Sequence, residues 1–288
     1  MAKQLGDLVP VWLTINEPTL IAPGGYIYGL TPPGHRDWGE ALTVARHVLM
    51  AHGRMYRAIK ESTGHNPEVG PVLAMPYFQP ADPDSWEDRE AAAGIDFVIN
   101  EYFLAGIDTG IIGPPIGQGE PVDGLKGTWD FIGLNYYSRH LVKHGVMPDP
   151  AAPAPPGAET TLMGYEVYPE GLYHQLVRLK KYGLPVHITE NGISTLDDGQ
   201  RSRHLLRHLR EAHRALEEGV DLRGYFYWTL VDNFEWLEGY QQWFGLCAME
   251  MGTRNRLPRP TAYLFRDIVS RNAVTPDQFR QHGLQLDP

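Results

Sequence analysis

Two glutamates that end strand-like runs of the chain are candidates for a catalytic pair. Residues 12–18 read Trp-Leu-Thr-Ile-Asn-Glu-Pro, and residues 187–192 read His-Ile-Thr-Glu-Asn-Gly. Each run breaks into a turn directly after its glutamate, Glu17 or Glu190. A pair of carboxyl groups, one serving as acid and base and the other as nucleophile, is what cleavage of a glycosidic bond requires. The two glutamates lie 173 positions apart, so only the tertiary fold can bring them together.

Each glutamate has a plainer interpretation when it is taken alone. A glutamate at the end of a strand is usually solvated or caps a neighbouring helix, and short motif matches carry false positives. Trp236 and Trp243 are compatible with an ordinary core. Glu235, between Phe234 and Trp236, is harder to explain in that way, because carboxylates are rarely buried without a partner.

Strand-like and helix-like runs alternate along the chain, which predicts βαβ units and a parallel sheet. The strand-like runs are almost wholly apolar, as expected where both faces of a sheet are covered. Both glutamates fall at carboxyl ends of strands, where α/β barrels place their catalytic groups. The predicted strands are 9–16, 69–75, 130–137, 185–190 and 222–231, and the predicted helices are 38–62, 85–105 with Ser85 as N-cap, 169–182, 200–218 and 261–270. A stretch rich in Pro and Ala, 147–160, predicts a surface loop.

Composition excludes several classes of function. A net charge of −10 argues against nucleic-acid and anionic-membrane partners, which select basic surfaces. The single cysteine, Cys247, excludes a disulfide framework and indicates a reducing, cytoplasmic compartment. No signal peptide and no membrane-spanning run is recognised. The histidines show no metal-ligand spacing, so we expect no metal or other cofactor, and His204, His208 and His213 are interpreted as a solvated helix face.

Four motifs in the right order carry a resemblance to glycoside hydrolase family 1, the β-glucosidase family. They are Ile-Asn-Glu-Pro at 15–18, Asp-Phe-Ile-Gly-Leu-Asn-Tyr-Tyr at 130–137, Thr-Glu-Asn-Gly at 189–192 and Tyr-Trp-Thr-Leu-Val-Asp-Asn-Phe-Glu-Trp at 227–236. The resemblance runs nearly end to end. It implies an α/β fold of the (β/α)8 TIM-barrel type and a retaining β-glycosidase that hydrolyses terminal non-reducing β-D-glycosyl residues in two covalent steps.

The resemblance also assigns roles by position. It implies that Glu17 is the acid/base and that Glu190 is the nucleophile. Small neutral β-glycosides are the expected substrates. The residues implied to bind substrate or to support the pair are Asn16 at the sugar 2-hydroxyl, Asn135 beside it, Tyr137 donating to the nucleophile, Trp228 under the glycone ring, and Glu235 and Trp236 at its outer hydroxyls. Between two close carboxyls, the acid/base is expected to keep its proton while donors such as Tyr137 keep the nucleophile ionised.

Two departures from the family pattern matter. Tyr165 stands where the family usually has a tryptophan that lines the leaving-group cleft. Family members also place three βα units before the Asn-Glu-Pro strand, whereas seven residues, 2–8, precede it here. The sequence therefore predicts one catalytic domain over residues 1–288 that supplies about five of eight strands, an incomplete barrel.

Three interpretations stay open for how the first three βα units of the barrel are supplied. The chain is a working β-glycosidase completed by an N-terminal barrel fragment, a weak or inactive fragment that binds sugar poorly, or a barrel completed in a homo-oligomer. Five strands cannot close an eight-stranded barrel, so the edges of the first and last strands should be apolar and unpaired.

Overall fold

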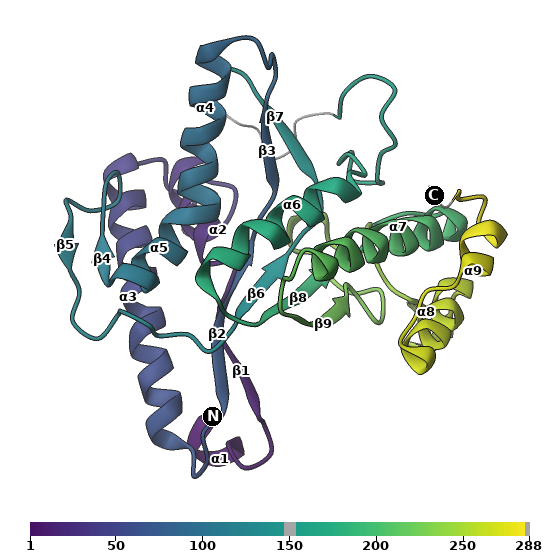
Figure 1. Cartoon of the computed structure of the whole chain (residues 1–288), viewed down its shortest axis with the longest axis horizontal. Coiled ribbons are helices and arrows are strands. Elements are labelled where there is room, and N and C mark those ends of the chain that lie inside the picture. Colours follow the sequence, from purple (N-terminus) through teal and green to yellow (C-terminus); the bar gives the residue numbers. More distant parts are fainter. Residues whose placement is uncertain (147–153, 286–288) are drawn as a thin grey trace.

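A parallel five-stranded sheet forms the centre of the protein, in a computed structural model that describes residues 1–146 and 154–285. The predicted surface loop at 147–160 thus lies partly outside the described residues. The strand order is β1-β2-β6-β8-β9, so neighbours in the sheet follow one another along the chain, with β1 and β9 at its edges (Figure 1). These strands are β1 (Val11–Asn16), β2 (Glu68–Ala74), β6 (Ile132–Asn135), β8 (Val186–Asn191) and β9 (Leu222–Tyr227).

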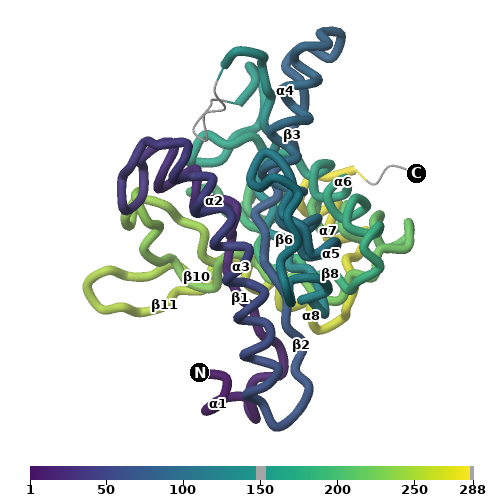
Figure 2. The backbone as a smooth tube through the Cα atoms, turned by 90° about the vertical axis from the view of Figure 1, so that its left-hand side faces the viewer, coloured from purple at the N-terminus to yellow at the C-terminus, as the bar shows by residue number. Residues whose placement is uncertain are grey.

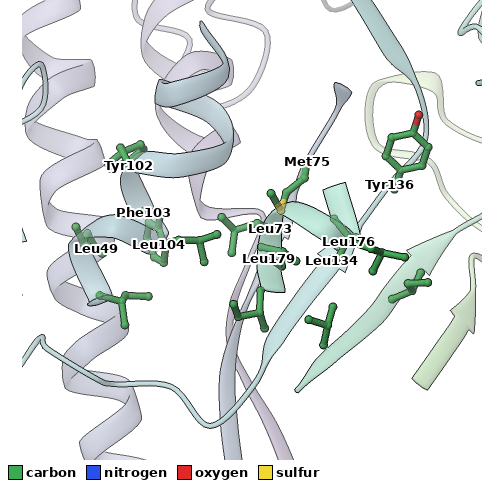
Figure 3. Close-up of a cluster of buried hydrophobic side chains, with 14 of the residues drawn as sticks. Leu49, Leu73, Met75, Tyr102, Phe103, Leu104, Leu134, Tyr136, Leu176 and Leu179 are labelled. Atoms are coloured by element: carbon green, nitrogen blue, oxygen red, sulfur yellow. The ribbon is translucent and has the colours of Figure 1, made fainter. Parts of the chain in front are cut away.

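Helices pack on one face of this sheet and enclose the main hydrophobic core. Leu73 of β2, Leu134 of β6 and Ile188 of β8 are fully buried there, together with Leu49, Phe103 and Leu176 from the helices (Figure 3). The helices are α1 (Ala2–Leu5), α2 (Pro18–Ala22), α3 (Trp38–Ser62), α4 (Trp86–Asp96), α5 (Tyr102–Thr109), α6 (Pro169–Leu179), α7 (Asp198–Glu217), α8 (Pro260–Arg271) and α9 (Pro276–Gln281).

Three two-stranded ladders and four short helical turns complete the described elements. Hairpin β10–β11 lies across the sheet from α6 and α7 (Figure 2). The ladders are β3 (Tyr77–Pro80) with β7 (Arg139–Val142), β4 (Ile111–Ile112) with β5 (Glu120–Pro121), and β10 (Cys247–Met249) with β11 (Arg256–Pro258). The turns are η1 (Pro23–Ile27), η2 (Phe97–Glu101), η3 (Lys180–Tyr182) and η4 (Trp236–Glu238).

Several predicted boundaries were wrong. The helix predicted over 85–105 begins as expected, with the Ser85 hydroxyl accepting from the Asp88 amide, but a π turn at 97–101 separates α4 from α5. The strand predicted over 222–231 ends at Tyr227, and the one predicted over 130–137 spans only Ile132–Asn135. Apolar residues continue past the end of β9, but several of them, such as Leu230 at 66%, are exposed to solvent.

The interpretation of His204 and His208 as a solvated face was also wrong. Both rings are buried on α7 and stack with centroids 3.8 Å apart. His204 Nδ1 and His208 Nε2 have no hydrogen-bond partner among the described residues. Burial lowers the pKa of His208 to about 3 and that of His204 well below the usual range, so both rings are neutral. Only His213 is exposed.

The two edge strands of the sheet expose apolar side chains. Val11 and Leu13 of β1 are 41% and 47% exposed, and Phe226 of β9 is 58% exposed. Their neighbours on the opposite face, such as Thr14, pack toward the helices. No helix among the described residues is long and apolar enough to cross a membrane.

Candidate active site

Glu17 is held at the end of β1 by a bend in the backbone. Its amide donates to the Val72 carbonyl of β2 at 2.8 Å, and its φ of 49° lies in the left-handed region. That conformation is uncommon for a residue with a Cβ and is concentrated at functional sites. Pro18 follows as the first residue of α2, where proline's missing donor is no loss. The Asn-Glu-Pro sequence thus turns the chain sharply and aims the carboxyl group at the carboxyl edge of the sheet.

Asn135, the last residue of β6, connects the two glutamates. Its side-chain nitrogen donates to Glu17 Oε1 at 3.0 Å and to Asn16 Oδ1 at 3.1 Å. A hydrogen bond from the same side chain lowers the pKa of Glu190. The Thr189 hydroxyl donates to Asn135 Oδ1 at 2.6 Å and so fixes which side of the amide faces the carboxyls. The asparagine therefore links the carboxyl ends of β1, β6 and β8, with β2 lying between β1 and β6, in one polar cluster.

Glu190 lies on β8 and accepts a hydrogen bond from Tyr137. The phenol oxygen is 2.7 Å from Glu190 Oε2. Burial, followed by the charge of Glu190, raises the pKa of Tyr137 well above its ordinary value, so the phenol keeps its proton and donates. Burial and the nearby charge of Glu17 nevertheless raise the pKa of Glu190 to about 7, against the lowering effect of Tyr137 and Asn135.

The acid/base candidate is shifted in the same direction. Burial raises the pKa of Glu17, opposed by the hydrogen bond from Asn135. The two carboxyls interact, so their protons are lost in steps that belong to the pair. The donation of Tyr137 favours ionised Glu190, as expected, but burial outweighs it. Burial therefore raises the proton affinity of both carboxyls, the direction that acid/base chemistry near neutral pH requires.

Trp228, Glu235 and Trp236 follow β9, and the structure brings the first two close to the acidic pair. Burial raises the pKa of Glu235, while a hydrogen bond from the Trp228 side chain lowers it and the charge of Glu17 raises it. Glu235 is thus close enough to sense the acidic pair. Trp236 is 79% exposed, which excludes its interpretation as ordinary core. Trp243 is half-buried.

Tyr165 lies beside the acidic cluster and next to a cavity of about 420 Å³. Burial and the charges of Glu235, Glu238 and Glu17, in that order, raise the pKa of its phenol. The adjacent Glu166 is buried and paired with Arg139 across two contacts of 2.6 and 2.8 Å. The loop that carries Tyr165 is therefore anchored to β7 at the rim of the site.

Three contributors to the site's shape were missed from the sequence. Asn191 is buried; it donates to the Tyr136 carbonyl and accepts from the Tyr225 hydroxyl. A Cβ on Gly192 would lie 1.8 Å from the Trp228 carbonyl oxygen, so only glycine permits this approach. Arg201 is fully buried on α7. In the sequence, Arg201 falls on the same apolar helix face as Leu205 and Ala212, and this position could have indicated that it is buried.

The described residues contain no group of three or more His, Cys, Asp or Glu side chains able to hold a metal ion. The fold and the cluster are those of a carboxylate-based α/β enzyme site: two glutamates, an asparagine and a tyrosine at the carboxyl edge of a parallel sheet. The family model described as Glycosyl hydrolase family 1 matches residues 1–274, and the chain belongs to that family.

Curated relatives and solved structures agree with this assignment. The chain is 35% identical to Beta-glucosidase A of Thermotoga maritima over 94% of its own length and 66% of the relative's. It is 33% identical to a Beta-galactosidase of Pyrococcus woesei over 96% and 60%. The beta-glycosidase structure from Pyrococcus horikoshii superposes with a TM-score of 0.88 at 35% identity, covering 99% of this chain and 66% of that one. The chain thus spans three fifths to two thirds of the length of these proteins.

Proposed function

We propose that this chain carries the catalytic carboxyl pair of a retaining β-glycosidase. The observation that supports this most directly is that the Asn135 side chain donates to Glu17 at 3.0 Å while residue Asn135 itself pairs with Glu190 of the neighbouring strand β8. Retaining enzymes hold their carboxyls roughly 5–5.5 Å apart, whereas inverting enzymes need roughly 6.5–9.5 Å to admit a water. Because the charge of Glu17 is near enough to raise the pKa of Glu190, we propose the shorter, retaining spacing and direct attack by one carboxylate.

The roles follow from the neighbours of each carboxyl. Glu190, with the Tyr137 phenol on one oxygen, is proposed to attack the anomeric carbon as the leaving oxygen takes the proton of Glu17. Formation of the glycosyl ester removes the charge of Glu190. The pKa of Glu17 then falls, and its carboxylate can deprotonate the water that hydrolyses the ester. Asn16, fixed by Asn135, is placed to meet the sugar 2-hydroxyl.

The substrates proposed are neutral β-glycosides, with Trp228 as the platform under the glycone and Glu235 and Trp236 at its outer hydroxyls. A carboxylate at Glu235 would repel a phosphate on the sugar. The names of the relatives, which include β-glucosidases and β-galactosidases, support gluco- and galacto-configured glycones. Tyr165 offers a leaving group a smaller stacking surface than a tryptophan would.

A second candidate is favoured by the open edges of the sheet. Val11, Leu13 and Phe226 expose apolar surface on edge strands, and such edges recruit partners. On this proposal the single domain is one part of a barrel that further βα units complete. Those units come from an N-terminal barrel fragment or from a second copy of the chain. By itself the chain would then be a weak catalyst, because remote glycone contacts supply transition-state binding energy.

Azide rescue tests the proposed chemistry. The wild-type chain should hydrolyse 4-nitrophenyl β-D-glucoside, and Glu190→Ala should abolish turnover. Azide should restore it and yield the α-glucosyl azide, since a small anion can enter the space of the missing carboxylate. Glu217→Ala, on the exposed end of α7, is the matched control and should keep the wild-type rate. A β-configured azide product, or full activity in Glu190→Ala, would exclude a Glu190 nucleophile.

Light scattering coupled to size-exclusion chromatography separates the two candidates. A monomer that hydrolyses the aryl glucoside with the efficiency of a complete family member would exclude the need for further units. Activity that appears only in an oligomer, or that rises when a separately expressed N-terminal part of a relative is added, would support the second candidate, in which further βα units complete the barrel.

A further inference from the structure

Arg201 joins helix α7 to the two loops that leave the catalytic strands. Its side chain is completely buried, and it makes a salt bridge at 3.0 Å from Nε to Asp198 Oδ1. Its other donors all reach backbone oxygens. These are the carbonyls of Ile193 at 2.9 Å and Phe244 at 3.1 Å from Nη1, and of Thr195 at 2.7 Å and Trp243 at 3.0 Å from Nη2. All five N–H groups of the guanidinium are therefore used.

The four carbonyls belong to segments that lead directly to the site. Residues 193 and 195 follow Glu190 and Gly192 at the end of β8. Residues 243 and 244 follow the segment of Glu235. The Phe244 carbonyl also accepts from the Thr229 amide at 3.4 Å, and the Thr229 carbonyl accepts from the Leu246 amide at 2.8 Å. One oxygen thus connects Arg201 to the residue after Trp228.

We propose that Arg201 is a positioning residue that sets the placement of the glycone-side residues Trp228 and Glu235 relative to Glu190. The proposal rests on the function proposed above. A guanidinium is a rigid planar fork, so it fixes the spacing of two loops as a flexible ammonium cannot. Because Arg201 is fully buried, losing the guanidinium would remove the side-chain donor of the Ile193 and Thr195 carbonyls and would leave those of Phe244 and Trp243 with only their backbone donors, the amides of Thr229 and Thr195.

The geometry restricts the effect to one side of the site. Arg201 has no donor left for a substrate, so it acts only through the loops. Glu17 directly follows β1, which β2 and β6 separate from β8 in the sheet, and its hydrogen bonds with Val72 and Asn135 do not involve these loops. Arg201 should therefore govern recognition of the glycone and not proton donation to the leaving group.

Arg201→Lys tests this division. The kcat/KM for 4-nitrophenyl β-D-glucoside should fall roughly 10- to 100-fold, the scale of a misplacement near 1 Å. The ratio of kcat/KM between β-glucoside and β-galactoside should change, while the dependence of kcat/KM on leaving-group pKa should match the wild type. Arg203→Lys, two positions along α7 with only an exposed pairing to Asp197, is the matched control. A role in stability alone would lower Tm without changing the glycone ratio, and that result would overturn the proposal.

Ser194→Ala covers the case in which Arg201→Lys does not fold. The Ser194 hydroxyl accepts from the Trp243 amide at 3.0 Å and donates to Gln242 at 2.8 Å, so it links the same two loops without a charge. It should change the glycone ratio in the same direction by a smaller factor. Ser202→Ala, which loses only a contact to Thr261, is the buried control and should not.

Hydrogen exchange tests whether Arg201 holds the two loops together, and it does not depend on substrate turnover. In Arg201→Lys or Ser194→Ala, amides of 191–196 and 242–246 should exchange faster, while those of β2 and β6 should not. Uniformly faster exchange, or no change in the two loops, would overturn the proposal. A wild-type chain that cleaves no β-glycoside would refute the proposed function, and the exchange pattern would still decide whether Arg201 holds the loops together.

Discussion

Removing the phenol of Tyr137 should displace the acidic limb of the pH–rate profile. The Tyr137 oxygen lies 2.7 Å from Glu190 Oε2, the length of a hydrogen bond to a charged acceptor. Such a bond contributes about 1.5–3 kcal/mol, and each pH unit corresponds to about 1.4 kcal/mol. In Tyr137→Phe the pKa of Glu190 should therefore rise by about 1 to 2 pH units.

The loss of activity at neutral pH depends on the pKa of Glu190 in the wild-type chain. Burial and the charge of Glu17 already raise the pKa of Glu190 to about 7, so about half of it is ionised at pH 7. After the change, about 1–10% would be ionised, and kcat/KM should fall by about 5- to 50-fold at that pH. The loss should become smaller as the pH increases, because the carboxylate is regenerated.

The assay is kcat/KM for 4-nitrophenyl β-D-glucoside between pH 5 and 10. Tyr136→Phe is the matched control, since that buried phenol donates to the Tyr168 carbonyl and not to a carboxylate; its acidic limb should stay in place. Carbon-13 NMR of glutamate-labelled protein follows the same titration without turnover. An acidic limb that does not move in Tyr137→Phe would refute the electrostatic argument.

Three further predictions concern the leaving group, the substrate and acid stability. Glu17→Ala should retain more activity on aryl glycosides with good leaving groups than on those with poor ones, and equal losses across a series of phenols would contradict its role as acid. The chain should prefer 4-nitrophenyl β-glucoside to its 6-phosphate because of the Glu235 carboxylate, so a preference for the phosphorylated substrate would show that argument to be wrong. Burial lowers the pKa of His208 to about 3, of His52 to about 4 and of His204 well below its usual range, whereas the unfolded rings titrate near 6.5. Below about pH 6.5 the unfolded chain binds more protons, so the free energy of unfolding should fall as the pH drops, by up to about 1.4 kcal/mol per pH unit for each ring. Urea unfolding at pH 7 and pH 5 should show a smaller loss in His208→Asn than in the wild type.

Local sequence was a reliable guide where one residue type dictates the backbone. Ser85 caps α4 and Pro169 opens α6, as predicted, because these residues satisfy or omit the free amides of a first turn. Sequence was unreliable where an apolar run continues past the end of a strand into a loop, as after Tyr227. It also led to the wrong prediction that His204 and His208 are exposed, because polar residues at helical spacing are normally interpreted as a solvent-facing helix face.

The sequence by itself determined the family, the parallel α/β fold and the two glutamates with their strand-end settings. These features are encoded in contiguous motifs, and the turn after each glutamate is a local property of the chain. Only the tertiary structure decided that Asn135, paired with Glu190 across the sheet, would donate to Glu17, and that burial would raise the pKa of Glu190 in spite of Tyr137. It alone showed that Arg201 joins the loops after β8 and β9. The reason is physical: desolvation and hydrogen-bond sharing depend on atoms brought together from distant positions, which no local pattern of residues specifies.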